Sequence, residues 1–340
     1  MSTRKRQGIL AAGNFIVDRI KRINVYPAEN MLATIDDETR SNGGGPYNVL
    51  KDLAAMGAGY PLVAAGRIGE DADGEWIRRD CQEHGIDAAG LAGDAEHPTS
   101  YTEVMTVRDT GRRTFFHRRG ASARFNGAGV NFSDSQARIF HLAYLMLLDE
   151  LDAFAPDGRT HASHLLERAS DAGHITSIDI VSTEHLRFRE IVLSALPYTD
   201  HLLINEVEAS RVLARALDPA SPADLLSAAC DLLKCGVRVA VVLHTEHGAV
   251  SARADGNRTS QGAVAVPRNF IRGANGAGDA FAAGYLHAMH ENQPPAAALA
   301  LAVCTAAACL ADPSPSAGLQ GVEACLELGR LYGFSTFPME

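Results

Sequence analysis

The sequence lacks a long apolar run, a block of positive charge and a large aromatic content, and each shortage narrows the class of protein. No stretch is apolar enough to span a membrane, and the apolar run Gly8–Ala12 is too short for the core of a signal peptide. Lysine and arginine form no cluster that would mark a nucleic-acid surface, and the net charge is −10. These absences predict a cytoplasmic globular protein that has neither a membrane nor a nucleic acid as its partner.

Cysteine is present, but not in a pattern that binds metal. None of the six cysteines forms a CxxC pair, and no His/Cys cluster has the spacing of zinc ligands. The pairs Cys230/Cys235 and Cys304/Cys309 lie in apolar segments rich in alanine and leucine. We therefore expect buried thiols in a reducing compartment.

Short apolar runs alternate with helical patterns along most of the chain. Strands are expected at Gly8–Ala12, Leu62–Ala65, Ile139–Leu142, Ile175–Ile180, His201–Ile204 and Val237–Leu243. Helices are expected at Asn48–Met56, Gly74–His84, Ala162–Ala172, Val207–Ala216, Pro222–Lys234, Asp279–His290, Pro295–Leu310 and Val322–Leu331. Buried strands that alternate with helices predict an α/β fold, a mostly parallel sheet between helices. No repeat or low-complexity linker divides residues 1–340, so we expect a single domain.

Two segments depart from this alternation. Thr99–Phe116 alternates polar and apolar residues around Arg108–Gly111, which predicts an antiparallel hairpin. Asp18–Asp37 has an extended and irregular pattern. We expect the two segments to form a small β-strand lid, built from about residues 14–40 and 98–120.

The segment with the clearest chemistry is Gly273–Phe281, a glycine-rich turn that leads directly into an alanine-rich helix. The first N–H groups of a helix have no partner inside the helix, so they form a ready anion site. Asp279 stands in the first turn, where the helix dipole favours its ionised form. A carboxylate beside an anion site suits phosphoryl transfer, because the carboxylate can take the proton of the attacking hydroxyl. The plainer interpretation is that Asp279 only caps the helix.

A second glycine-rich turn, Gly43–Gly45, precedes Asn48 and an apolar helix. The glycines allow a ligand to approach the backbone closely, and an asparagine can donate and accept hydrogen bonds at once, which suits a polyol. As an alternative, Asn48 is a helix cap. Asp18 follows the first strand and is expected at the ligand crevice of an open α/β sheet, or else in a solvated loop.

In order and spacing, these segments resemble the motifs of the ribokinase family, the PfkB-type carbohydrate kinases. Gly276-Ala277-Gly278-Asp279 matches the C-terminal motif of that family, whereas the leading Asp-Thr of the motif is replaced here by Gly273-Ala274. The resemblance implies that Asp279 is the catalytic base and that Gly276, Ala277 and Gly278 form the anion hole, with Asn275 beside the nucleotide.

The resemblance assigns further residues to the acceptor substrate. Asp18, Gly44 and Asn48 match positions that bind the hydroxyls of a sugar in the family. Arg119, in the segment Phe116–Ala121, matches a run that lies near the substrate, and a pair of surface arginines is the alternative interpretation.

Nucleotide and metal residues follow from two more segments. Asn205 and Glu208 match an Asn-x-x-Glu motif that organises Mg²⁺ and phosphate through water, although a helix cap would give the same pattern. Val241–Ala249 departs from the family, because Thr245 takes the place of a phosphate-loop glycine while Gly248 is retained.

Taken together, the resemblance implies a Rossmann-like domain with a β-lid that transfers a phosphoryl group from ATP to a hydroxyl of a small sugar. It also implies Mg²⁺ and a monovalent cation near the anion hole. Because exposed strand edges invite pairing, we expect a homodimer through the lid. A nucleoside kinase is the alternative acceptor class, and the aromatic content of 6% leans toward sugars. A non-catalytic sugar-binding protein is favoured by Gly273-Ala274 and Thr245 but opposed by the retained Asp279.

Overall fold

The computed structural model describes residues 6–337 and contains a large sheet with the strand order β13-β12-β11-β10-β9-β8-β1-β4-β5. From β5 to β11 neighbouring strands run parallel, and β12 and β13 are antiparallel at one edge. The strands are β1 Ile9–Gly13, β4 Leu62–Gly69, β5 Ile86–Asp94, β8 Ile139–Leu145, β9 Ile175–Ile180, β10 His201–Asn205, β11 Ala240–Thr245, β12 Gly248–Arg253 and β13 Arg258–Gly262. The predicted mostly parallel α/β sheet is confirmed.

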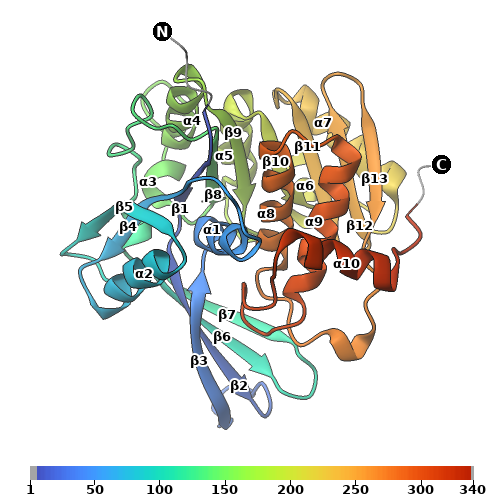
Figure 1. Cartoon of the computed structure of the whole chain (residues 1–340). Coiled ribbons are helices and arrows are strands. Elements are labelled where there is room, and N and C mark those ends of the chain that lie inside the picture. Colours follow the sequence, from blue (N-terminus) through green and yellow to red (C-terminus); the bar gives the residue numbers. More distant parts are fainter. Residues whose placement is uncertain (1–5, 338–340) are drawn as a thin grey trace.

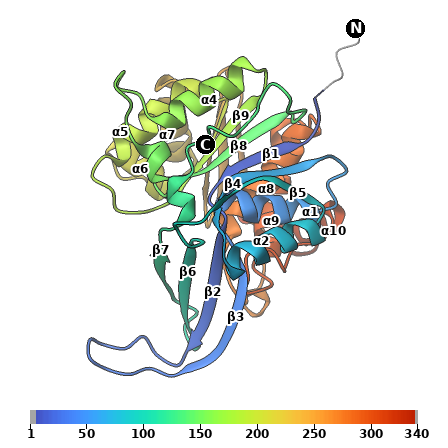
Figure 2. The ribbon, with the colours of Figure 1, turned by 90° about the vertical axis from the view of Figure 1, so that its left-hand side faces the viewer.

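Helices cover both faces of this sheet (Figures 1 and 2). One face carries α1 Gly45–Ala55, α2 Ala72–Glu83, α8 Ala277–His290, α9 Pro295–Cys309 and α10 Val322–Tyr332. The other carries α3 Asp149–Asp152, α4 His161–Asp171, α5 Phe188–Ala195, α6 Glu206–Leu213 and α7 Pro222–Lys234, and short 3₁₀ turns occur at Ala121–Arg124, Leu196–Tyr198 and Arg268–Phe270. None of the helices in residues 6–337 is long and apolar enough to cross a membrane.

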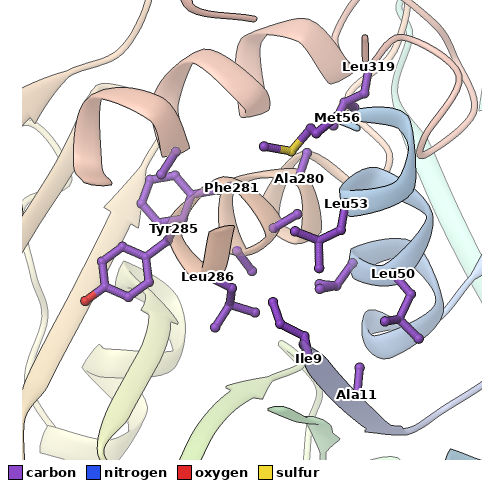
Figure 3. Close-up of a cluster of buried hydrophobic side chains, with 14 of the residues drawn as sticks. Ile9, Ala11, Leu50, Leu53, Met56, Ala280, Phe281, Tyr285, Leu286 and Leu319 are labelled. Atoms are coloured by element: carbon purple, nitrogen blue, oxygen red, sulfur yellow. The ribbon is translucent and has the colours of Figure 1, made fainter. Parts of the chain in front are cut away.

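Strand β1 shows why there are two cores. Successive side chains of a strand point to opposite faces, and accordingly Ile9 and Ala11 belong to one buried apolar cluster while Leu10 and Ala12 belong to the other. Figure 3 shows the first cluster, where side chains of α1, α8 and β1 gather together. Because α1 carries Asn48 and α8 carries Asp279, this core fixes the two candidate site residues relative to each other.

A second sheet of four strands, in the order β3-β2-β6-β7, lies below the large sheet in Figure 1. Its strands are β2 Ile16–Ile23, β3 Ile35–Gly43, β6 Tyr101–Val107 and β7 Arg113–Arg118. We call it the lid sheet; its strands fall largely within the ranges 14–40 and 98–120. The segment expected to be extended and irregular is divided into β2, β3 and a connection that reaches away from the body in Figure 2.

Strands β5 and β13 of the large sheet were not predicted, because their side chains are not uniformly buried. Strand β5 alternates irregularly between buried and exposed residues, and β13 (Arg-Thr-Ser-Gln-Gly) is largely polar, so neither shows an apolar run. Strand β11 begins at Ala240 rather than Val237, because Arg238 and Val239 donate their N–H groups to the loop carbonyls of Thr199 and Asp200.

Candidate active site

A cavity of about 770 Å³ lies between the lid sheet and the large sheet. Its lid side includes Asp18, Thr102 and His117, and its body side includes the N-terminal turns of α1 and α8. Four carboxyl groups line it, those of Asp18, Asp179, Glu208 and Asp279. The sites predicted separately from the sequence therefore meet, in large part, in one place.

Asp279 lies in the first turn of α8, and only 4% of the residue is exposed. The Asn48 side-chain amide donates to its Oδ2 at 2.7 Å, and the Tyr144 hydroxyl donates to its Oδ1 at 2.5 Å. Burial raises the pKa of Asp279 to about 6, against the lowering effect of these two donors. A carboxylate with such a pKa is ionised near neutral pH and is a stronger base than an exposed aspartate.

The turn before α8 forms an open cradle beside this carboxylate. Gly276 has a φ of 77°, and a Cβ there would lie 2.6 Å from the Pro315 side chain, so only glycine fits. At Gly278 a Cβ would meet only His244 Cε1, at 3.6 Å, which leaves room for a ligand. Gly276, Ala277 and Gly278 all line the cavity, so the N–H groups at the helix start are placed to bind an anion.

The amide of Asn48 is held in one orientation from behind. The Asn42 side-chain NH₂ group donates to Asn48 Oδ1 at 2.7 Å and to the Ser316 hydroxyl at 2.9 Å. This leaves the NH₂ group of Asn48 turned toward Asp279. The sequence analysis did not single out Asn42 or Ser316, and no local pattern connects them.

Tyr144 is fixed on two sides. Its N–H donates to Asn14 Oδ1 at 2.7 Å, and a Cβ at Gly45 would lie 2.8 Å from its ring. Tyr144 lies near the carboxyl end of the parallel strand β8, and Asp179 lies near that of β9. Both line the cavity and both were missed, although strand ends at this edge are where ligands bind in open α/β sheets.

Asp18 lies within the lid strand β2, not at the end of β1 as expected, and it still faces the cavity. Asn275 Nδ2 donates to its Oδ2 at 3.0 Å. Burial raises the pKa of Asp18 to about 7, against this hydrogen bond and with help from the charge of Asp279. Gly44, at the start of α1, also lines the cavity, so Asp18, Gly44, Asn48 and Asn275 are brought together.

At the other end of the cavity, Asn205 and Glu208 form the capping box of α6. The Glu208 carboxylate accepts from the Asn205 N–H at 3.0 Å and from the Ser182 hydroxyl at 2.8 Å. Burial raises the pKa of Glu208 to about 7 and raises that of Asp179 well above its ordinary value, the latter with help from the charge of Glu208. Asn205 is therefore a helix cap, and Glu208 lines the cavity as well as completing the capping box.

This donor set fits Mg²⁺ that is bound mainly by phosphates and water. Carboxylate oxygens are the ligands that Mg²⁺ prefers, and one or two of them suffice. Within residues 6–337 no group of three or more His, Cys, Asp or Glu side chains is arranged as a metal cage. Asp179 and Glu208 would therefore hold the ion from one side.

Arg119 does not line the cavity, contrary to its predicted place beside the substrate. Its guanidinium donates to the carbonyl of Met146 at 2.9 Å and forms an ion pair with Asp149. A carboxylate and a carbonyl thus already satisfy its charge.

Thr245 and Gly248 also lie outside the cavity lining. The Thr245 hydroxyl donates to the carbonyl of Pro219 at 3.0 Å and accepts from the N–H of His247 at 3.0 Å, which stabilises its own turn. A Cβ at Gly248 would lie 2.4 Å from the carbonyl oxygen of Gln261, so close packing against β13 requires this glycine.

Residues 9–320 match the model of the pfkB family carbohydrate kinases. Rice fructokinase-1 is 27% identical over 210 residues, a match that spans 59% of this chain and 60% of that protein. The fold is similar to that of Arabidopsis thaliana ribokinase, solved with ribose and ATP, with a TM-score of 0.75 and 20% identity over 95% of this chain and 98% of the other. It is also similar to Methanocaldococcus jannaschii nucleoside kinase, with a TM-score of 0.73 and 18% identity over 96% and 99% of the two chains.

Proposed function

The chain belongs to the pfkB family of carbohydrate kinases, and we propose that it transfers the γ-phosphoryl group of ATP to a hydroxyl of a small sugar or sugar-like metabolite, with Asp279 as the general base. The observation that carries this proposal is the setting of Asp279. A buried carboxylate, held by two donors, lies in the first turn of α8, and Gly276, Ala277 and Gly278 at the start of that helix line the same cavity. This pairing supports a proton acceptor next to a site for a phosphoryl group.

In this mechanism Asp18, Gly44 and Asn48 position the acceptor so that one hydroxyl lies against Asp279. The hydroxyl proton passes to Asp279 while its oxygen forms the new bond to the γ-phosphorus, and the bond from that phosphorus to the ADP oxygen breaks. The N–H groups of Gly276–Gly278 stabilise the charge of the transferred group.

The nucleotide end is assigned to Asn205, Asn275 and the Glu208 carboxylate. Glu208 and Asp179 would hold Mg²⁺, which neutralises phosphate charge when it is bound. Thr245 and Gly248 shape the neighbouring turn between β11 and β12 without lining the cavity. A monovalent-cation requirement belongs to the proposal too, and assays in sodium and in potassium salts would test it.

Phe115 gives the nucleoside alternative a specific basis. It lies on the cavity side of the lid sheet and is 51% exposed, so its ring is free to stack on a base or a sugar. A panel that contains nucleosides beside sugars separates the two acceptor classes.

The experiment is an ADP-release assay with ATP, Mg²⁺ and a panel of hydroxylated metabolites, run on the wild type and on Asp279→Asn. Loss of a general base costs about 10²–10⁴-fold in rate. We therefore expect a fall in kcat of that size for Asp279→Asn, with ATP affinity little changed in calorimetry. Near-normal turnover by Asp279→Asn would end its assignment as base. ATP binding without turnover of any acceptor would favour a sugar-binding protein on a degenerate frame.

We also propose that the enzyme works as a homodimer in a reducing compartment such as the cytoplasm. All six cysteines have free thiols, and the lid sheet has β3 and β7 at its edges. The lid sheet would close over the acceptor, because its inner face forms one wall of the cavity.

A further inference from the structure

One face of the lid sheet forms the roof of the cavity, and the strand register identifies its residues. Asp18 of β2 is opposite Thr102 of β6, and Thr102 is opposite His117 of β7. Two and four residues before His117 on the same face are Phe115 and Arg113, and both line the cavity. The cavity roof therefore runs from a carboxylate at one end of the face to a guanidinium at the other.

Arg113 is the only arginine or lysine among the described residues that line this cavity. Four carboxyl groups line the same cavity, and none of them attracts an anion. The N–H groups of α8 and the Asp179/Glu208 end already serve the nucleotide. Arg113 belongs to the lid sheet, which also carries the proposed acceptor residue Asp18, and it is not among the groups assigned to the nucleotide.

The guanidinium of Arg113 has no ion pair or hydrogen bond within residues 6–337. It makes a cation–π contact with Phe115, in which the guanidinium carbon lies 5.6 Å from the centroid of the ring. Burial lowers the pKa of Arg113. Arg118, at the other end of β7, has a ring contact of the same kind with Tyr101, whereas Arg119, the first residue after β7, forms an ion pair with Asp149. A partly buried cation without a partner costs free energy, and an anionic ligand offsets that cost.

We propose that Arg113 binds an anionic oxygen group of the acceptor, a carboxylate or a phosphate ester, so that the substrate is an acidic sugar derivative rather than a neutral sugar. This rests on the proposed kinase function. The planar guanidinium fork binds either group in a bidentate way. Strand spacing puts Arg113 about 13 Å along β7 from His117, and the side chain folds back over Phe115. The acceptor is therefore extended, with its hydroxyl at Asp279, its carbon chain near Phe115 and its anion at Arg113.

The test compares matched acceptor pairs on the wild type and on Arg113→Gln. Each pair differs only at one end: an aldonic acid against its alditol, and a sugar phosphate against its sugar. Loss of a charged hydrogen-bond partner corresponds to a decrease of about 10- to 100-fold in kcat/KM. We expect that loss for the acidic member of the favoured pair and less than about threefold change for the neutral member. The pair that responds shows whether the group is a carboxylate or a phosphate.

Two control variants make the result specific. Arg113→Lys keeps the charge but loses the fork, so it should fall between the wild type and Arg113→Gln. Arg112→Gln removes an exposed charge one residue away, outside the cavity, and should change neither acceptor class. In thermal melting, the acidic acceptor should stabilise the wild type more than it stabilises Arg113→Gln, which measures binding without turnover.

Other outcomes would overturn the inference while the kinase function stands. A wild type that prefers neutral acceptors contradicts it, as does an Arg113→Gln variant that raises the KM for ATP equally with every acceptor. The second result would assign Arg113 to the transferred phosphoryl group. If no acceptor of either class is phosphorylated, the proposed function itself fails, and a failure of that kind is visible in the wild type alone.

Discussion

The pKa of Asp279 is set by two opposing influences, and the one that raises it is the larger. Burial disfavours the charge, and the donors Asn48 and Tyr144 favour it. Each carboxylate oxygen accepts one of these donors and retains a lone pair for an acceptor hydroxyl. The residue is therefore held in place without being blocked, and its titration should be visible in the rate.

We predict that kcat/KM falls as the pH drops through about 6, because protonated Asp279 cannot accept a proton. Tyr144→Phe removes a donor that lowers this pKa, so the acid limb of the pH–rate profile should move to higher pH. Tyr332→Phe, a tyrosine outside the cavity on α10, is the matched control and should leave the limb in place. An unshifted limb in Tyr144→Phe would show that the hydroxyl does not set the basicity of Asp279.

The proposed role of Glu208 in binding Mg²⁺ is tested by the Mg²⁺ concentration that the reaction requires. Glu208→Gln keeps an oxygen that can accept from the Asn205 N–H, so the capping box and the fold should survive. It removes the charge that would attract a metal-bound water, so half-maximal activity should need more Mg²⁺. Glu206→Gln, in the same helical turn but outside the cavity, is the control. Coincident Mg²⁺ titrations of wild type and Glu208→Gln would exclude the metal role.

Sequence reasoning singled out Asp279 and Asn48, which belong to glycine-rich turns, and Asp18 of β2, but not three other residues of the cavity lining that lie on strands. Asp279 and Asn48 stand beside glycines whose conformations leave a signature in the sequence. Tyr144, Asp179 and Arg113 lie in ordinary strand patterns, and only the sheet topology brings them to the cavity. Arg119 was assigned to the substrate from a motif, and a motif does not show that the guanidinium is already paired with Asp149.

At the scale of elements, α1 carries a buried carboxyl group, that of Asp52, one turn after Asn48. Asp52 is fully buried, and neither of its oxygens has a hydrogen bond of good geometry. Burial raises its pKa well above the ordinary value, and the nearby Ser316 hydroxyl lowers it only in part. Helix α1 therefore has an ionisable group within the apolar core that positions Asn48.

We predict that Asp52→Asn stabilises the protein, and does so more as the pH rises. The folded-state pKa lies above the unfolded one, so the folded wild type holds its proton more tightly and loses stability as the pH rises above about 4. The asparagine has no such loss. The melting temperatures of the two proteins should thus be similar near pH 4 and diverge toward pH 8, with the asparagine variant the more stable.

Glu246→Gln, which removes an exposed carboxylate in the turn after β11, is the control and should change the unfolding free energy little. A melting difference for Asp52→Asn that does not depend on pH would mean that the pKa of Asp52 is the same in the folded and the unfolded protein.

For the whole molecule, the parallel sheet was predictable because its central strands are buried on both faces and read as apolar runs. The lid sheet was predictable in outline because Thr99–Phe116 alternates in polarity. The contacts that join these parts were not. Asn42 of the lid sheet and Ser316 of the C-terminal loops are 274 residues apart and share a hydrogen bond that a linear pattern does not encode. The two sheets meet at the site through such long-range contacts.

Within residues 6–337, the outer edge of β3 in the lid sheet pairs with no other strand. Strand β3 is exposed on both faces from Ile35 to Arg40 and forms one edge of its sheet. In the connection before it, Val25, Tyr26, Met31 and Leu32 expose between 47% and 86% of their surface. An open edge beside exposed apolar side chains is a surface that another chain can cover, and in a homo-oligomer the covering chain is a second copy.

We therefore predict that sedimentation equilibrium gives twice the chain mass of 36.2 kDa. The double variant Met31→Glu, Leu32→Glu places two charges in the proposed interface and should shift the equilibrium to the monomer, since both side chains are exposed and neither supports the fold. Leu186→Glu is the matched control, a fully exposed leucine on the body of the protein that should leave the dimer intact. A wild type that stays monomeric at every concentration would leave the lid edge unpaired, and the exposure of Met31 and Leu32 would then need another explanation.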